Sequence, residues 1–137
     1  MQPLPLGFGE MDATHDEFVE RVEALMRADD GSVPQALGAL AEHLRQHFDE
    51  EGAWMASTGF PSAACHLEEH AAVLRSVDEV QSLVAAGEPG VARAFAFELT
   101  RWFPEHTDAM DRGLAKWIVK TRLGGEPIAI HHRMKRA

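Results

Sequence analysis

A run of regularly spaced inward residues between positions 32 and 58 constrains the fold of this chain more than any other feature. The residues stand three or four apart, which is the spacing of one face of an α-helix. They are Leu37, Leu40, Leu44, His47, Glu51 and Trp54. Burying His47 and Glu51 on an apolar helix face costs several kcal/mol unless another group pairs with them. A metal ion is one such partner.

Three further stretches carry the same helical spacing, so we expect four amphipathic helices. They cover Asp12 to about Arg27, Ser32 to Thr58, Ser62 to the turn at Gly87, and about Val91 to Gly124. Asp12, Ser32 and Ser62 are of the residue types that cap helix starts, and Gly59 suits a helix end. With no strand pattern and short connections, the sequence predicts an all-α, up-down-up-down four-helix bundle.

The chain of 137 residues has the length of one domain. We expect the bundle to occupy residues 1–118 and a C-terminal extension to occupy residues 119–137. Residues 120–137 hold five basic residues and one acid, a net charge of +4. Because the whole chain carries −9, the remaining residues carry −13. An acidic body argues against a nucleic-acid surface. The basic tail could dock on a protein partner of unknown identity or on an acidic lipid surface, but we expect an ordinary solvated terminus.

The sequence also bears on where the protein resides. No apolar run approaches the roughly 20 residues of a membrane-spanning helix. The first nine residues do not resemble a secretory signal. The single cysteine, Cys65, excludes an internal disulfide and suits a reducing compartment. We therefore expect a cytoplasmic protein without a membrane span.

Polar residues on the inward helix faces form one candidate metal site. Each of the four helices contributes to a set of five histidines and two acids: His15, His47, Glu51, His66, His70, His106 and Asp111. Residues four apart on a helix lie one turn from each other, with Cβ atoms about 5–6 Å apart, and can share an ion. Seven ligands exceed the usual protein complement of one transition metal, whereas two metals about 3.5–4 Å apart account for all seven. Imidazole and carboxylate without thiolate suit iron, manganese or zinc.

One pair in this set does not fit a regular helix. His106 and Asp111 are five residues apart, about 140° around an α-helix. A π-type turn would bring both side chains to the same face, as would a break after Pro104. We therefore predict a local distortion between residues 104 and 111.

The ordered set of seven residues resembles the hemerythrins, particularly the single-domain bacterial ones. The likeness covers about residues 8–118. It extends to neighbours of the seven: Met11-Asp12 before the first histidine, Phe18, Phe48, Met55 and Trp102. A single histidine on an apolar helix face is more often a hydrogen-bonded core residue than a metal ligand. Five histidines and two acids in this order are not explained as ordinary core residues.

The resemblance implies two iron ions per chain, bridged by oxo or hydroxo, that bind dioxygen reversibly. His66, His70 and His106 would hold one iron, His15 and His47 the other, and Glu51 and Asp111 would bridge them. An apolar oxygen pocket is expected from Phe18, Phe48, Trp102, Phe103 and Thr107. Oxygen storage, delivery or sensing would follow, without catalytic turnover.

Two other readings remain open. The same site could act as an enzyme on peroxide or nitric oxide, or the chain could be a signalling module that acts through residues 119–137. Thr107 is relevant to the enzymatic alternative. Relatives usually carry isoleucine or leucine at this position, and a hydroxyl there could admit water. We expect faster autoxidation than in a Thr107→Ile variant.

Three polar residues near the predicted ligands are not expected to bind metal. Glu50 and Glu69 are expected to point to solvent. His43, one turn before His47, is expected at the edge of the helix stripe, at the surface or beside a ligand.

Overall fold

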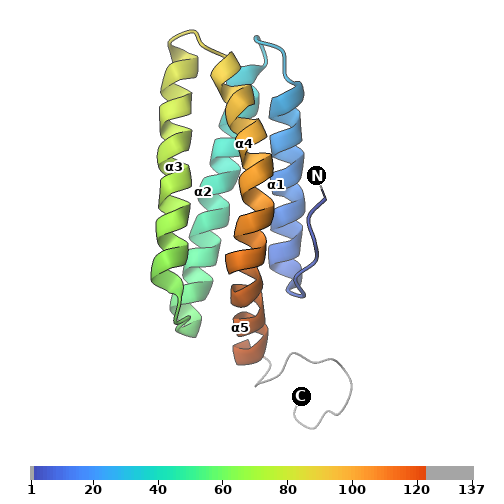
Figure 1. The fold of residues 1–137 in the computed structure, drawn as a ribbon, viewed down its shortest axis with the longest axis vertical. Coiled ribbons are helices and arrows are strands. Elements are labelled where there is room, and N and C mark those ends of the chain that lie inside the picture. The colour runs from blue at the N-terminus through green and yellow to red at the C-terminus, as the bar shows by residue number, and fades with distance from the viewer. Residues whose placement is uncertain (1, 123–137) are drawn as a thin grey trace.

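A computed structural model describes residues 2–122, which form four long helices lying side by side (Figure 1). The helices are α1 (Gly9–Arg27), α2 (Val33–Thr58), α3 (Ala63–Ala85) and α4 (Gly90–His106). A π-helical turn (Thr107–Asp111) and helix α5 (Arg112–Arg122) extend α4 in the same direction. Successive helices alternate in direction and are joined by short turns, so the predicted up-down-up-down four-helix bundle is confirmed.

The predicted end of α2 at Gly59 is confirmed, but the two predicted serine caps make no capping hydrogen bond. Gly59 ends α2 with a φ of 66°, a left-handed conformation that a residue without Cβ adopts freely. Ser32 and Ser62 stand at the starts of α2 and α3, but neither hydroxyl makes a capping hydrogen bond. Instead, the Asp29 carboxylate accepts the Ser32 backbone N–H at 2.9 Å.

The start of α1 differs from the prediction. The helix begins at Gly9, three residues before the expected cap at Asp12. The Asp12 carboxylate instead accepts backbone N–H groups of the preceding segment, from Leu6 at 2.8 Å and Gly7 at 3.3 Å. Asp12 therefore holds the N-terminal segment against the bundle, where Phe8 packs edge-on to Trp54.

Two apolar clusters fill the core, with a polar layer between them. The larger cluster extends toward the α1–α2 and α3–α4 turns and includes Phe18, Leu25, Leu40, Val77 and Leu99. The smaller cluster lies toward the other end and contains Met11, Trp54, Met55, Leu114, Ala115 and Ile118. On α2, for example, His47 and Glu51 lie between Leu44 and Trp54. The apolar layers thus enclose the polar residues from both ends.

The π-turn confirms the distortion predicted between residues 104 and 111. At its end the Arg112 N–H bonds to the Thr107 carbonyl, five residues back rather than four. The wider turn keeps both His106 and Asp111 in the core, where they are 3% and 0% exposed. Beyond the π-turn, the apolar face of α5 packs in the smaller cluster.

Part of the expected C-terminal extension is helical, because α5 continues to Arg122. The Arg122 guanidinium lies 5.2 Å from the centre of the Phe8 ring, so this helix contacts the N-terminal segment. The rest of the extension, residues 123–137, lies outside the described residues, and the domain boundary at residue 118 stays a prediction. Within residues 2–122, no helix is long and apolar enough to span a membrane.

Candidate metal centre

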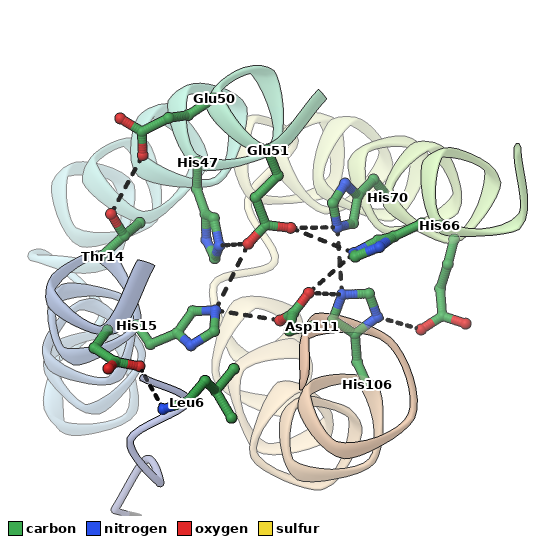
Figure 2. Close-up of polar contacts among 12 residues, drawn as sticks. Leu6, Thr14, His15, His47, Glu50, Glu51, His66, His70, His106 and Asp111 are labelled. Atoms are coloured by element: carbon green, nitrogen blue, oxygen red, sulfur yellow. Dashed lines mark hydrogen bonds and ion pairs between the residues drawn. The ribbon is translucent and has the colours of Figure 1, made fainter. Parts of the chain in front are cut away.

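All seven polar side chains predicted for the metal site meet in the middle of the bundle (Figure 2). Each is at least 96% buried. One side chain comes from α1, two each from α2 and α3, one from the end of α4 and one from the π-turn. Regular helices place the pairs that are four apart, and the π-turn places the pair that is five apart.

Five of the seven residues form one group around a shared point. One ligand atom from each of Glu51, His66, His70, His106 and Asp111 lies within 4.8 Å of the others. The Asp111 Oδ1 atom lies 2.9 Å from His66 Nε2 and 3.1 Å from His106 Nε2. The Glu51 Oε1 atom lies 3.2 Å from His70 Nε2. We call this group the three-histidine position.

A second group lies on the other side of the same carboxylates and contains His15, His47 and Glu51. Here the other oxygen of Glu51, Oε2, lies 2.7 Å from His47 Nε2 and 3.7 Å from His15 Nε2. The other oxygen of Asp111, Oδ2, lies 3.2 Å from His15 Nε2. We call this group the two-histidine position. Glu51 and Asp111 each have one oxygen at the three-histidine position and the other oxygen at the two-histidine position. This is the arrangement expected of bridging carboxylates.

The charges of these carboxylates govern protonation of the cluster. Burial would raise the pKa of Glu51 and of Asp111, but hydrogen bonds from the surrounding histidines lower both below their usual values. Burial opposes protonation of His15 and His66, yet their close polar contacts with Asp111 and Glu51, and the negative charges of these two acids, raise the pKa of each imidazole to about 9. Burial lowers the pKa of His70. Metal binding would therefore displace protons from His15 and His66.

The donor atoms fit a transition-metal site. Among the described residues, Glu51 Oε1, Asp111 Oδ2 and His15 Nε2 are buried atoms without a hydrogen-bond partner, and all three face the interior of the cluster. Buried polar groups left unpaired are costly, and coordination to a cation would satisfy them. Nitrogen and oxygen donors without a thiolate suit iron, manganese or zinc.

The expected oxygen-pocket residues surround the cluster on different sides. Phe103 meets His15 edge-on at 5.1 Å between ring centres and lies 4.5 Å from the Phe18 ring. Phe48 stacks on His70 at 3.8 Å and lies 5.3 Å from His47. Phe103 therefore contacts the two-histidine position, with Phe18 packed against it, and Phe48 contacts a histidine of each position.

Trp102 and Thr107 complete the expected pocket set. Trp102 stacks on His106 at 4.4 Å between ring centres, on the three-histidine side. The Thr107 hydroxyl is buried and has no hydrogen-bond partner among the described residues. Thr107 and Phe103 also line a surface pocket of about 120 Å³ that the N-terminal residues Pro3 and Leu4 partly cover.

Comparison with known proteins supports the same assignment. Residues 6–118 match the family described as the hemerythrin HHE cation binding domain. The chain belongs to the hemerythrin family. It is 36% identical to a bacteriohemerythrin of Ralstonia nicotianae (strain ATCC BAA-1114 / GMI1000) over 119 residues, 87% of each chain. The resemblance seen in the sequence is therefore confirmed, and the buried cluster is the candidate iron site of a hemerythrin.

In this hemerythrin, Glu69 does not point freely to solvent as the sequence suggested. Its Oε1 atom accepts the Nδ1–H of His106 at 2.6 Å and the Nε1–H of Trp102 at 3.2 Å. The helix period placed Glu69 beside the inward stripe of α3, and no pattern within one helix shows which residues of α4 it meets.

The other two neighbours of the cluster also have partners. Glu50 is exposed, as expected, and accepts the Thr14 hydroxyl at 3.3 Å. His43 is 7% exposed, with Nδ1 lying 3.6 Å from Glu17 Oε1 and its ring 5.6 Å from that of His47. His43 thus lies beside the cluster, between α1 and α2, rather than within either group.

Proposed function

We propose that this hemerythrin binds dioxygen reversibly at a pair of iron ions bridged by Glu51 and Asp111. The observation that carries the proposal is the position of these two carboxylates, each with one oxygen toward either histidine group. Family membership supports iron as the metal and dioxygen as the ligand. When bound, a ferrous pair supplies the open coordination position and the two electrons that reversible oxygen binding requires.

The residues around the cluster then have distinct roles. His66, His70 and His106 would hold one iron, and His15 and His47 the other, with a solvent-derived bridge between the ions. The two-histidine position has fewer protein ligands and would leave room for dioxygen. The Phe103 ring beside His15, with Phe18 packed against it, would exclude water and protons from that side.

Surroundings of low polarity favour carriage over catalysis. Oxygen storage, delivery or sensing would follow from binding alone. A cytoplasmic location suits a chain whose single cysteine, Cys65, is exposed and unpaired.

Anaerobic reconstitution with ferrous iron, followed by cycles of oxygen addition and removal, tests the proposal. We expect visible absorption that appears with oxygen, persists, and disappears on deoxygenation over several cycles. The apo protein loaded with zinc is the control and should remain colourless. Irreversible conversion to a ferric spectrum within the first cycle would contradict carriage.

A second candidate function is reduction of peroxide or nitric oxide at the same irons. The observation that favours it is Thr107, whose hydroxyl is buried without a partner while its side chain lines a surface pocket. This pocket could hold small polar molecules next to Phe103, whose ring contacts His15. Consumption of many equivalents of peroxide or nitric oxide per chain, with a reductant present, would support this function. Stoichiometric reaction that then stops would count against it.

A further inference from the structure

Glu69 on α3 connects two side chains of α4 through a single oxygen atom. Its Oε1 accepts the Nδ1–H of His106 at 2.6 Å and the Nε1–H of Trp102 at 3.2 Å. The 2.6 Å contact is short for a nitrogen donor, as expected for a hydrogen bond to an ionised carboxylate. Glu69 is partly exposed, at 35% of its side chain, whereas His106 is 2% exposed. The carboxylate therefore covers His106 from the solvent side.

This hydrogen bond selects one tautomer of His106. With the proton on Nδ1, the lone pair is on Nε2. The Nε2 atom faces the cluster, 3.1 Å from Asp111 Oδ1 and 3.3 Å from His70 Nε2. Glu69 thus leaves the nitrogen that faces the metal position free to coordinate.

His106 is distinct in this respect among the five histidines of the cluster. The Nδ1 atoms of the other four are buried and have no hydrogen-bond partner in the described part of the chain: His15, His47, His66 and His70. The support from Glu69 therefore falls on the three-histidine position and not on the two-histidine position.

Trp102 restricts the same arrangement from a second direction. Its ring stacks on His106 with 4.4 Å between centres and 20° between planes. Its indole N–H shares the Glu69 oxygen. The stack fixes the plane of the imidazole, and the shared oxygen fixes the rotamer of Glu69.

We propose that Glu69 is a positioning residue that selects the His106 tautomer and strengthens metal binding at the three-histidine position. The inference rests on the proposed metal centre. A carboxylate that accepts the outer N–H of a metal-bound histidine makes the imidazole a better donor, and loss of such a partner typically weakens metal affinity about 10- to 100-fold. Glu69 would thereby make the two metal positions unequal.

The test compares Glu69→Gln with Glu68→Gln. Glu68 is the neighbouring residue on α3 and is exposed, so its variant removes the same charge from the same helix without touching His106. Ferrous iron binding is measured anaerobically by competition with a chelator. We expect Glu69→Gln to weaken one of two iron equivalents about 10- to 100-fold, and Glu68→Gln to bind both as the unaltered chain does.

A spectroscopic readout separates positioning from general stability. In ¹⁵N NMR of the zinc-loaded protein, we expect His106 to be the Nδ1–H tautomer with a strongly downfield proton. Glu69→Ala should lose that proton signal, and Glu68→Ala should keep it. The melting temperature of the metal-free protein should be similar in all variants.

Two outcomes would overturn the inference. One is iron affinity in Glu69→Gln within threefold of the unaltered chain at both equivalents. The other is equal weakening of both equivalents with a lower melting temperature of the metal-free protein, which would make Glu69 merely structural. Neither outcome depends on oxygen binding, so failure of the oxygen proposal and failure of this inference are distinguishable.

Discussion

The two proposed metal positions share their carboxylates but differ in what surrounds them. The three-histidine position has His66, His70 and His106, and the last is held from outside by Glu69 and Trp102. The two-histidine position has only His15 and His47, with the Phe18 and Phe103 rings on the side of His15. We therefore propose that a metal binds more firmly on the three-histidine side, whereas the other side combines fewer ligands with apolar neighbours.

This difference shows how one buried layer can serve two purposes. The shared acids connect the two positions, because each acid has one oxygen directed to each side. A metal on the three-histidine side would therefore help to orient the carboxylates for its neighbour. The unequal number of histidines would then leave room for an additional ligand at the two-histidine position.

Removing the shared carboxylate of Glu51 should have the largest effect, because Glu51 contributes an oxygen to both metal positions. Glu51→Gln keeps the side-chain shape but deletes the charge that faces four histidines. We expect loss of both irons, with affinity falling by more than the roughly 100-fold cost of losing an outer partner. Metal analysis after anaerobic reconstitution measures this effect.

Glu50→Gln is the matched control, because Glu50 is the neighbouring acid on α2 and is exposed. Circular dichroism should show the same helix content in both variants. Full iron content in Glu51→Gln would contradict a bridging role for this residue.

Truncating a histidine of the two-histidine position should affect one metal position and leave the other intact. We expect His15→Ala to retain about one iron per chain, at the three-histidine position, and to lose the spectral response to oxygen. His43→Gln is the control, since His43 is buried beside His47 but belongs to neither group. Iron content and visible spectra measured together distinguish the two variants. An intact oxygen response in His15→Ala would place oxygen binding elsewhere.

A smaller effect is expected at Thr107, which bears on how well the oxygen-binding side is sealed. Thr107→Ile replaces a buried, unpartnered hydroxyl with an apolar group, so entry of water and protons should be hindered. We expect autoxidation to slow severalfold relative to the unaltered chain. Thr121→Ile, at an exposed position of α5, should leave the rate unchanged. Equal or faster autoxidation in Thr107→Ile would refute this account of the residue.

Much of this arrangement was predictable because helical spacing is written directly in the sequence. His47 with Glu51, and His66 with His70, are pairs on regular helices, and the structure places each pair together as expected. The π-turn was predictable only indirectly. It was one of two ways, with a helix break after Pro104, for Asp111 to join a site that the other residues already defined.

What escaped prediction depends on contacts between segments. The partners of Glu69 lie on α4, and the spacing within α3 carries no information about them. Asp12 has the residue type of a helix cap, but its carboxylate binds a lead-in segment whose path the sequence does not specify. Such contacts follow from how the helices and the N-terminal segment pack against each other.

We propose that these seven side chains hold two irons that together bind one dioxygen reversibly. The decisive measurement is oxygen uptake by the anaerobically reconstituted protein, made alongside its iron content. We expect two irons per chain, one dioxygen taken up per iron pair, and release of that dioxygen on deoxygenation. One iron per chain, or uptake without release, would contradict it.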